Sequence, residues 1–270
     1  MQKLTDNVYA RTDFHGCNSG FVVTGEGAVV IDTPMVPAEA KAWRQAIEEI
    51  APIRYVINNE AHTDHYCGNC YMGGTLIGTE ATRTALQRAK VEDWKRELKM
   101  MAPDYDTSGD TDFYFRTPDI TFTGDMTLYC AAHTIHIMRM PGHTPDQLAV
   151  YVPEERVVFT SDNINLGIPI FINAVPYRWL ESLDRLNELD VDVVIPGHGE
   201  VTDKSAFTRM KKMIQIWLDI AAGAIAEGLE LEETRQRFYR APEFAEVPKD
   251  GPMSGFFNMN IDSLYRALKQ

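Results

Sequence analysis

The fold of this chain is decided between residues 55 and 65, which read YVINNEAHTDH. Tyr55–Ile57 is an apolar run that predicts a buried strand, and four potential metal ligands follow it: Glu60, His62, Asp64 and His65. Alternate side chains of an extended segment point the same way, so the first three share one face, and the fourth joins them if the chain turns. Imidazole and carboxylate groups suit zinc, manganese or iron. A metal site is favoured over a solvated polar loop, because unpaired charges beside a buried strand are costly.

Three later stretches supply further ligands, each where a β-branched run breaks into a turn. They are His143 in MPGHTP at 140–145, Asp162 in FTSDN at 159–163, and His198 in IPGHG at 195–199. Ligands at the ends of several strands that meet at one edge of a sheet form a site on a rigid scaffold. A single Gly-His turn is weak evidence, but the ordered set predicts one shared centre.

The order of these motifs resembles the metallo-β-lactamase superfamily over about residues 1–203. The first motif of that family is H-x-H-x-D-H, and this chain has Glu60 at the first histidine position. Asp32, which follows the run VVI at 29–31, matches an early Asp of the family at a strand end. The resemblance implies an α/β fold, a four-layer αββα sandwich, with two divalent metal ions. Zinc is the expected metal, and iron and manganese are alternatives.

The resemblance also implies how the ligands divide between two ions. One ion takes Glu60, His62 and His143, the other takes Asp64, His65 and His198, and Asp162 bridges them. Because Glu60 replaces a histidine, two roles remain open for it. As an anionic ligand it makes the site harder and favours iron or manganese more than usual. As an outer group it hydrogen-bonds a ligand histidine and leaves an enzyme with one ion.

Such a site favours hydrolysis, because a divalent ion lowers the pKa of bound water to about 7 and polarises a carbonyl or phosphoryl oxygen. Asp64 is expected to orient the nucleophile and to pass a proton to the leaving group. The sequence therefore predicts a dinuclear hydrolase that uses a metal-bound hydroxide to cleave an ester, lactone, lactam or thioester of a small molecule. A di-iron or mononuclear iron oxidoreductase on the same fold is the first alternative. A metal-poor binding protein is the second, and the full ligand set argues against it.

Composition narrows the partners of the chain. Its 270 residues carry a formal net charge of -13, which argues against a nucleic-acid surface because such surfaces are basic. The N-terminal residues have no apolar core of signal-peptide length, and no run of about 18 apolar residues predicts a membrane span. A cytoplasmic location is expected, and it fits the four cysteines, which need not be paired in a reducing compartment.

Cys67 and Cys70 form a C-x-x-C pair. They are interpreted as small buried residues, with a redox or extra metal role as the alternative.

The pattern along the chain divides it into two parts. Residues 1–203 are predicted to form the α/β domain, with a long helix over residues 80–101. Residues 204–270 are predicted to form a helical extension, with helices at 206–227 and 229–239, a proline-containing break, and a last helix at about 262–268. Three interpretations of the extension remain open: a cap on the site, an element of a homo-oligomer, or outer packing of the sandwich.

Overall fold

The computed structural model describes residues 1–165 and 168–269. Contacts between residues divide the chain into two compact units. The first comprises Met1–Met140, Asp146–Leu166 and Leu189–Lys204, and the second comprises Pro141–Pro145, Gly167–Glu188 and Ser205–Gln270. Within the described residues, none of the helices combines the length and the apolar composition needed to cross a membrane. The predicted domain boundary after residue 203 stays a prediction.

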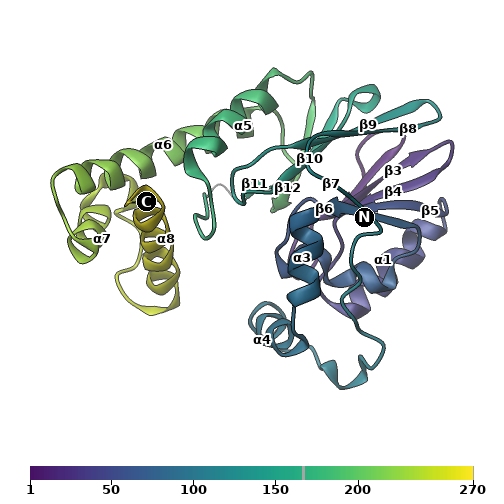
Figure 1. Cartoon of the computed structure of the whole chain (residues 1–270), viewed down its shortest axis with the longest axis horizontal. Helices are drawn as coiled ribbons and strands as arrows, with labels where there is room; N and C mark the ends of the chain where they lie inside the picture. Colours follow the sequence, from purple (N-terminus) through teal and green to yellow (C-terminus); the bar gives the residue numbers. More distant parts are fainter. Residues whose placement is uncertain (166–167, 270) are drawn as a thin grey trace. The chain divides into compact units, whose positions relative to one another are not determined.

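The first unit contains a sheet of seven strands, in the order β1-β2-β3-β4-β5-β6-β7 (Figure 1). The strands are β1 (Gln2–Lys3), β2 (Val8–Arg11), β3 (Ser19–Thr24), β4 (Gly27–Ile31), β5 (Ile53–Ile57), β6 (Thr75–Thr79) and β7 (Ile120–Phe122). Neighbours from β1 to β4 are antiparallel, and neighbours from β4 to β7 are parallel. Helix α1 (Pro37–Glu48) provides the first parallel crossover, because parallel neighbours cannot be joined by a tight turn. The carboxyl ends of β4 and β5 therefore lie at one edge of the sheet.

A second sheet of the same unit has five strands, in the order β12-β11-β10-β9-β8. The strands are β8 (Met126–Cys130), β9 (His133–Arg139), β10 (Leu148–Val152), β11 (Val157–Asn165) and β12 (Val193–His198). The pair β11–β12 is parallel, and the other pairs are antiparallel. Each strand of this pair carries one predicted ligand, Asp162 or His198.

Alternation along the strands explains how the first unit is packed. In β4, Val29 and Ile31 join a buried apolar cluster with residues of the second sheet, which include Ile137, Val150 and Phe159. Ala28 and Val30 of the same strand join another cluster with residues of α1. Successive side chains of a strand point to opposite faces, so β4 is buried on both sides. The first sheet therefore has helical packing on one face and the second sheet on the other.

The prediction of one long helix over residues 80–101 is wrong in one respect. The structure has two helices there, α3 (Glu80–Arg88) and α4 (Val91–Met101), because Ala89 and Lys90 adopt extended backbone angles. Neither Gly nor Pro lies at this break, so local signals do not reveal it. Leu86 of α3 and Trp94 of α4 both enter one buried cluster, and we attribute the break to this tertiary packing.

The second unit contains four α-helices among its described residues: α5 (Pro176–Glu188), α6 (Ser205–Ala226), α7 (Leu231–Arg240) and α8 (Gly251–Lys269). Helices α7 and α8 lie beside α6 (Figure 1), and an aromatic cluster around Trp217 includes Phe238, Phe244 and Phe257. The last helix begins at Gly251 and not near residue 262 as predicted. Proline is tolerated in the first turn of a helix, where no intrahelical partner of its nitrogen is needed, so Pro252 does not delay the start.

Candidate metal centre

His65 is fixed in orientation by a carboxylate from a neighbouring strand end. The short helix α2 (Thr63–Tyr66) follows β5 and buries His65 completely. Nδ1 of His65 lies 3.1 Å from Oδ2 of Asp32, the first residue after β4. Asp32 has a left-handed φ of 54° and accepts a 2.7 Å hydrogen bond from the backbone N–H of Asn59. A carboxylate only accepts, so Nδ1 carries the proton and Nε2 is left to bind a metal, as in most metal-binding histidines.

Nε2 of His65 is surrounded by carboxylate oxygens. It is buried and, among the residues that the structure describes, has no hydrogen-bond partner. It lies 3.6 Å from Oε1 of Glu60, 3.6 Å from Oδ2 of Asp64 and 3.4 Å from Oδ1 of Asp162. A buried nitrogen without a hydrogen bond is costly, and a cation between these atoms removes that cost.

His198 completes this group from the end of β12. Its Nε2 lies 3.2 Å from Oδ2 of Asp64 and 3.4 Å from Oδ1 of Asp162. Two ligands of a tetrahedral zinc, each about 2.1 Å from the ion, lie roughly 3.4 Å apart. The distances that link Asp64, His65, Asp162 and His198 match this spacing, so these residues fit one divalent cation.

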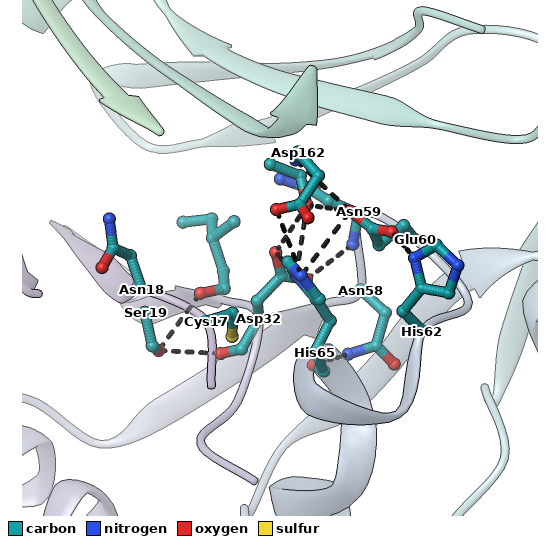
Figure 2. A network of polar contacts seen from close by, with 12 residues as sticks. Cys17, Asn18, Ser19, Asp32, Asn58, Asn59, Glu60, His62, His65 and Asp162 are labelled. Carbon is teal, nitrogen blue, oxygen red and sulfur yellow. Dashed lines mark hydrogen bonds and ion pairs between the residues drawn. The ribbon is translucent and has the colours of Figure 1, made fainter. Parts of the chain in front are cut away.

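Asp162 reaches the group from the second sheet, while Asp32 and His65 lie in segments that follow strands of the first sheet (Figure 2). Oδ2 of Asp162 accepts a 3.0 Å hydrogen bond from Asn165, and the side chain of Asp162 is buried. Two residues of this region, Asp32 and Ser161, have a positive φ without being glycine. Such strained conformations concentrate at functional sites.

The pKa shifts of His198 and Asp162 agree with a cation site. Burial acts to lower the pKa of His198, but the charges of Asp162 and Asp64 and their hydrogen bonds outweigh it and raise the pKa to about 10. The pKa of Asp162 is well below its usual value, because the nearby imidazoles outweigh the effect of burial. In the absence of a cation, the site therefore favours protonated imidazoles beside ionised carboxylates.

We expect cation binding to release protons at pH 7. Metal ligation needs a neutral imidazole, whereas a pKa of about 10 keeps His198 protonated at pH 7. Zinc affinity is therefore expected to rise as the pH increases from 6 to 9. The raised pKa also stabilises the metal-free fold fully below about pH 6.5, and this contribution is lost as the pH rises through about 10. Titration calorimetry in two buffers of different ionisation enthalpy measures the protons released, and a count of zero would contradict the expectation.

Glu60, whose Oε1 lies 3.6 Å from Nε2 of His65, also contacts His62 with its other oxygen. Nδ1 of His62 lies 2.5 Å from Oε2 of Glu60 (Figure 2). Burial acts to lower the pKa of His62, but the charge and hydrogen bond of Glu60 raise it to about 9. Glu60 is itself 1% exposed. Glu60 is therefore buried in this hydrogen-bonded pair, whereas the side chain of His62 is 31% exposed.

His143, the remaining predicted ligand, belongs to the second unit. It is buried, its Nδ1 lies 2.9 Å from the backbone oxygen of Ile170, and its ring contacts Trp179 with centroids 5.8 Å apart. Nδ1 therefore carries a proton toward a carbonyl, which is the usual orientation of a ligand histidine. Its binding of the first ion stays a prediction.

Two residues of the site, Ser161 and Gln147, were not predicted from the sequence. Oγ of Ser161 donates a 2.8 Å hydrogen bond to Oε1 of Glu60, and Nε2 of Gln147 donates a 3.2 Å bond to the same atom. Ser161 directly precedes Asp162, so its position in a ligand motif was a usable signal. Gln147 precedes β10 by one residue and carries no such signal.

Comparison with known sequences points to the same family that the order of the motifs resembles. The model of the family described as the Metallo-beta-lactamase superfamily matches residues 12–198. The Beta-lactamase-like protein 2 homolog of Caenorhabditis elegans is 26% identical over 192 residues, which cover 70% of this chain and 58% of that protein. The linear primary-alkylsulfatase of a Pseudomonas species is 22% identical over 214 residues, which cover 65% of this chain and 40% of that protein. The chain thus spans about half the length of these two curated relatives.

Solved structures agree on the fold. A sec-alkylsulfatase from a Pseudomonas species has a TM-score of 0.73 and 16% identity, over 98% of this chain and 49% of that chain. A metallo-beta-lactamase family protein from Thermus thermophilus has a TM-score of 0.69 and 16% identity, over 99% of this chain and 94% of that chain. The predicted α/β fold with a C-terminal helical region is confirmed.

Proposed function

The chain belongs to the metallo-β-lactamase superfamily, and we propose that it is a metal-dependent hydrolase of a small-molecule ester, lactone, lactam or thioester. One observation carries the proposal: four ligand atoms, from Asp64, His65, Asp162 and His198, lie 3.2–3.6 Å apart in the pairs described above. This is the spacing of atoms that share one small cation. Zinc is the proposed metal, with iron and manganese as alternatives.

Asp64 and Asp32 have distinct proposed roles at the centre. When bound, a divalent cation supplies a water molecule whose pKa is lowered to about 7. Asp64 is the proposed catalytic residue, because a carboxylate beside the attacking water can orient it and transfer its proton to the leaving group. Asp32 holds the ring of His65 through Nδ1, which keeps Nε2 directed at the centre.

Several finer predictions remain predictions. They concern a first ion at Glu60, His62 and His143, a homo-oligomer formed through the C-terminal helices, and a cytoplasmic location. The helical region could equally cap the site or pack on the sandwich. None of these predictions is needed for hydrolysis, because a single open zinc site suffices to activate water.

Metal analysis and a substrate panel test the proposal together. The full chain is purified without added metal, its metal content is determined, and hydrolysis is followed for carboxylic esters, lactones, lactams and thioesters. An alkyl sulfate is added because one curated relative is a linear primary-alkylsulfatase. We expect at least one substrate to be cleaved, the activity to be lost with a chelator and to return with zinc. Absence of any tightly bound divalent ion would refute the proposal.

The iron oxidoreductase alternative is separated by different readouts. It requires bound iron with a visible absorption band, and consumption of oxygen by the purified chain. A colourless zinc protein that hydrolyses a substrate without oxygen uptake excludes this alternative. A panel without turnover, together with iron and oxygen uptake, would instead favour it.

A further inference from the structure

The ring of His143 is oriented by a short backbone strip, residues 169–171, which lies outside the helices and strands of the described structure. Nδ1 of His143 donates to the carbonyl oxygen of Ile170, the middle residue of this strip, at 2.9 Å. A carbonyl oxygen only accepts, so the bond keeps the proton on Nδ1, and Nε2 carries the lone pair that can bind a metal. The position of the Ile170 carbonyl therefore decides where Nε2 of His143 points.

A side chain of the C-terminal helix α8 holds both flanks of the strip. Nδ2 of Asn260 donates a 2.8 Å hydrogen bond to the carbonyl oxygen of Pro169, and Oδ1 of Asn260 accepts a 2.5 Å bond from the backbone N–H of Phe171. A carbonyl can only accept and an N–H can only donate, so these two bonds also fix the orientation of the amide. Asn260 is 1% exposed, and its two bonds are therefore shielded from water.

The hydrogen bonds of the strip match the alternation of an extended backbone. In such a backbone the polar groups of one residue point to one side, and those of its two neighbours point to the other side. Pro169 and Phe171 bond to Asn260, whereas the carbonyl of Ile170 between them bonds to His143. The amide of Asn260 therefore takes the place of a neighbouring strand and holds the strip against the imidazole.

Aromatic packing fixes the surroundings of the strip. Phe171 contacts Trp179 and Trp217, with ring centroids 6.0 and 5.4 Å apart, and Trp179 also contacts the ring of His143 at 5.8 Å. All three aromatic side chains are buried. His143, the strip and Asn260 belong to the second unit, so the connection from α8 to the imidazole is complete within that unit.

We infer that Asn260 is a positioning residue for His143, which acts through residues 169–171 to direct Nε2 of the imidazole toward a metal ion. The inference rests on the proposed function, because it takes His143 as a ligand of the predicted first ion. An apolar side chain at position 260 would leave buried backbone groups of Pro169 and Phe171 without their partner, which is costly. The strip would then shift, and His143 would lose the acceptor that fixes its ring.

A double-substitution cycle tests the inference. Zinc is titrated, against a competing chelator of known affinity, into the metal-free full-length wild type, Asn260→Leu, His143→Ala and the double variant, and bound zinc is counted by elemental analysis. We expect His143→Ala to weaken one binding event by more than about 100-fold, and Asn260→Leu to weaken the same event by about tenfold. In the His143→Ala background, Asn260→Leu is expected to add less than about twofold, because its effect passes through His143. An equal loss in both backgrounds would show that Asn260 is only structural, against the inference.

Asn258→Leu is the matched control. Asn258 is half-buried in the same helix, and the change from an amide to an apolar side chain is the same. Its zinc affinity is expected to stay within about twofold of the wild type, because sites without shared partners act independently. If both variants lose affinity equally, general destabilisation explains the loss and the inference fails.

The wild type gives a readout that needs no variant to fold. Long-range ¹H–¹⁵N spectra report which ring nitrogen of His143 carries the proton. We expect a protected proton on Nδ1, and a shift of the Nε2 resonance when zinc is added; Asn260→Leu is expected to lose the protection. A ring protonated on Nε2, or resonances of His143 that zinc leaves unchanged, would overturn the inference and leave hydrolysis at the group of four ligands intact. A wild type that binds no ion and hydrolyses nothing would instead overturn the proposed function.

Discussion

Replacing His198 by Ala is expected to weaken zinc binding more than about 100-fold, since loss of an outer partner of a ligand alone costs 10–100-fold. Nε2 of His198 lies within 3.4 Å of both Asp64 and Asp162, so its loss leaves two carboxylates and one imidazole for the ion. Hydrolysis is expected to fall by about 10³-fold or more, because the metal contributes several kcal/mol to catalysis and 1.36 kcal/mol is tenfold in rate. Metal content and turnover of the purified variant measure both effects.

His136→Ala is the matched control for this substitution. His136 lies in β9 of the same unit, where its Nδ1 contacts Oγ1 of Thr127 at 3.2 Å, and it belongs to no group of potential metal ligands among the described residues. The same chemical change there is expected to leave zinc affinity within about twofold, because half-buried His136 contacts Thr127 and Tyr151, which are not proposed ligands. Equal loss in both variants would attribute the effect to general destabilisation and not to the metal centre.

The grouping of these candidate ligands was predictable because the signal is local in the sequence. Glu60, His62, Asp64 and His65 lie within six residues after a strand, and strand periodicity is enough to place them at one edge of a sheet. His198 and Asp162 were predictable for a similar reason, since each lies in a turn or strand end after a β-branched run. Convergence of the two segments depends on the parallel pairing of β11 with β12, which the residue pattern did not indicate.

The hydrogen-bond donors of Glu60 were not predictable from the sequence. Its donors, Ser161 and Gln147, are separated from it by 101 and 87 residues, so only the folded sheets bring them together. For the same reason the sequence kept two roles open for Glu60, as a ligand or as the partner of a histidine. The break between α3 and α4 is a second case, because the packing of Leu86 and Trp94 in one cluster leaves no local signal.

Gly197→Ala is expected to disable the centre without removing any ligand. Gly197 precedes His198 in β12, and a Cβ built on it would lie 1.8 Å from Oδ1 of Asp162 and 2.8 Å from its backbone nitrogen. Part of this clash is with backbone, which cannot rotate away, so the carboxylate of Asp162 must leave its position or the two strands must separate. We expect zinc affinity to fall more than about 100-fold, as for a lost ligand, and stability to fall by about 1–3 kcal/mol from overpacking. Zinc titration and urea unfolding measure the two effects separately.

Gly124→Ala is the control, because a Cβ at that exposed position of the same unit meets nothing within 4 Å. It is expected to keep zinc affinity and to change stability by less than about 0.5 kcal/mol. Comparing the two variants also separates the contribution of Asp162 to zinc binding from the contribution of the β11–β12 pairing to stability. If Gly197→Ala loses stability but keeps zinc affinity, Asp162 does not hold the ion. If it loses affinity at nearly unchanged stability, close approach of β12 to Asp162 is needed specifically for the metal, which explains why glycine is required beside His198.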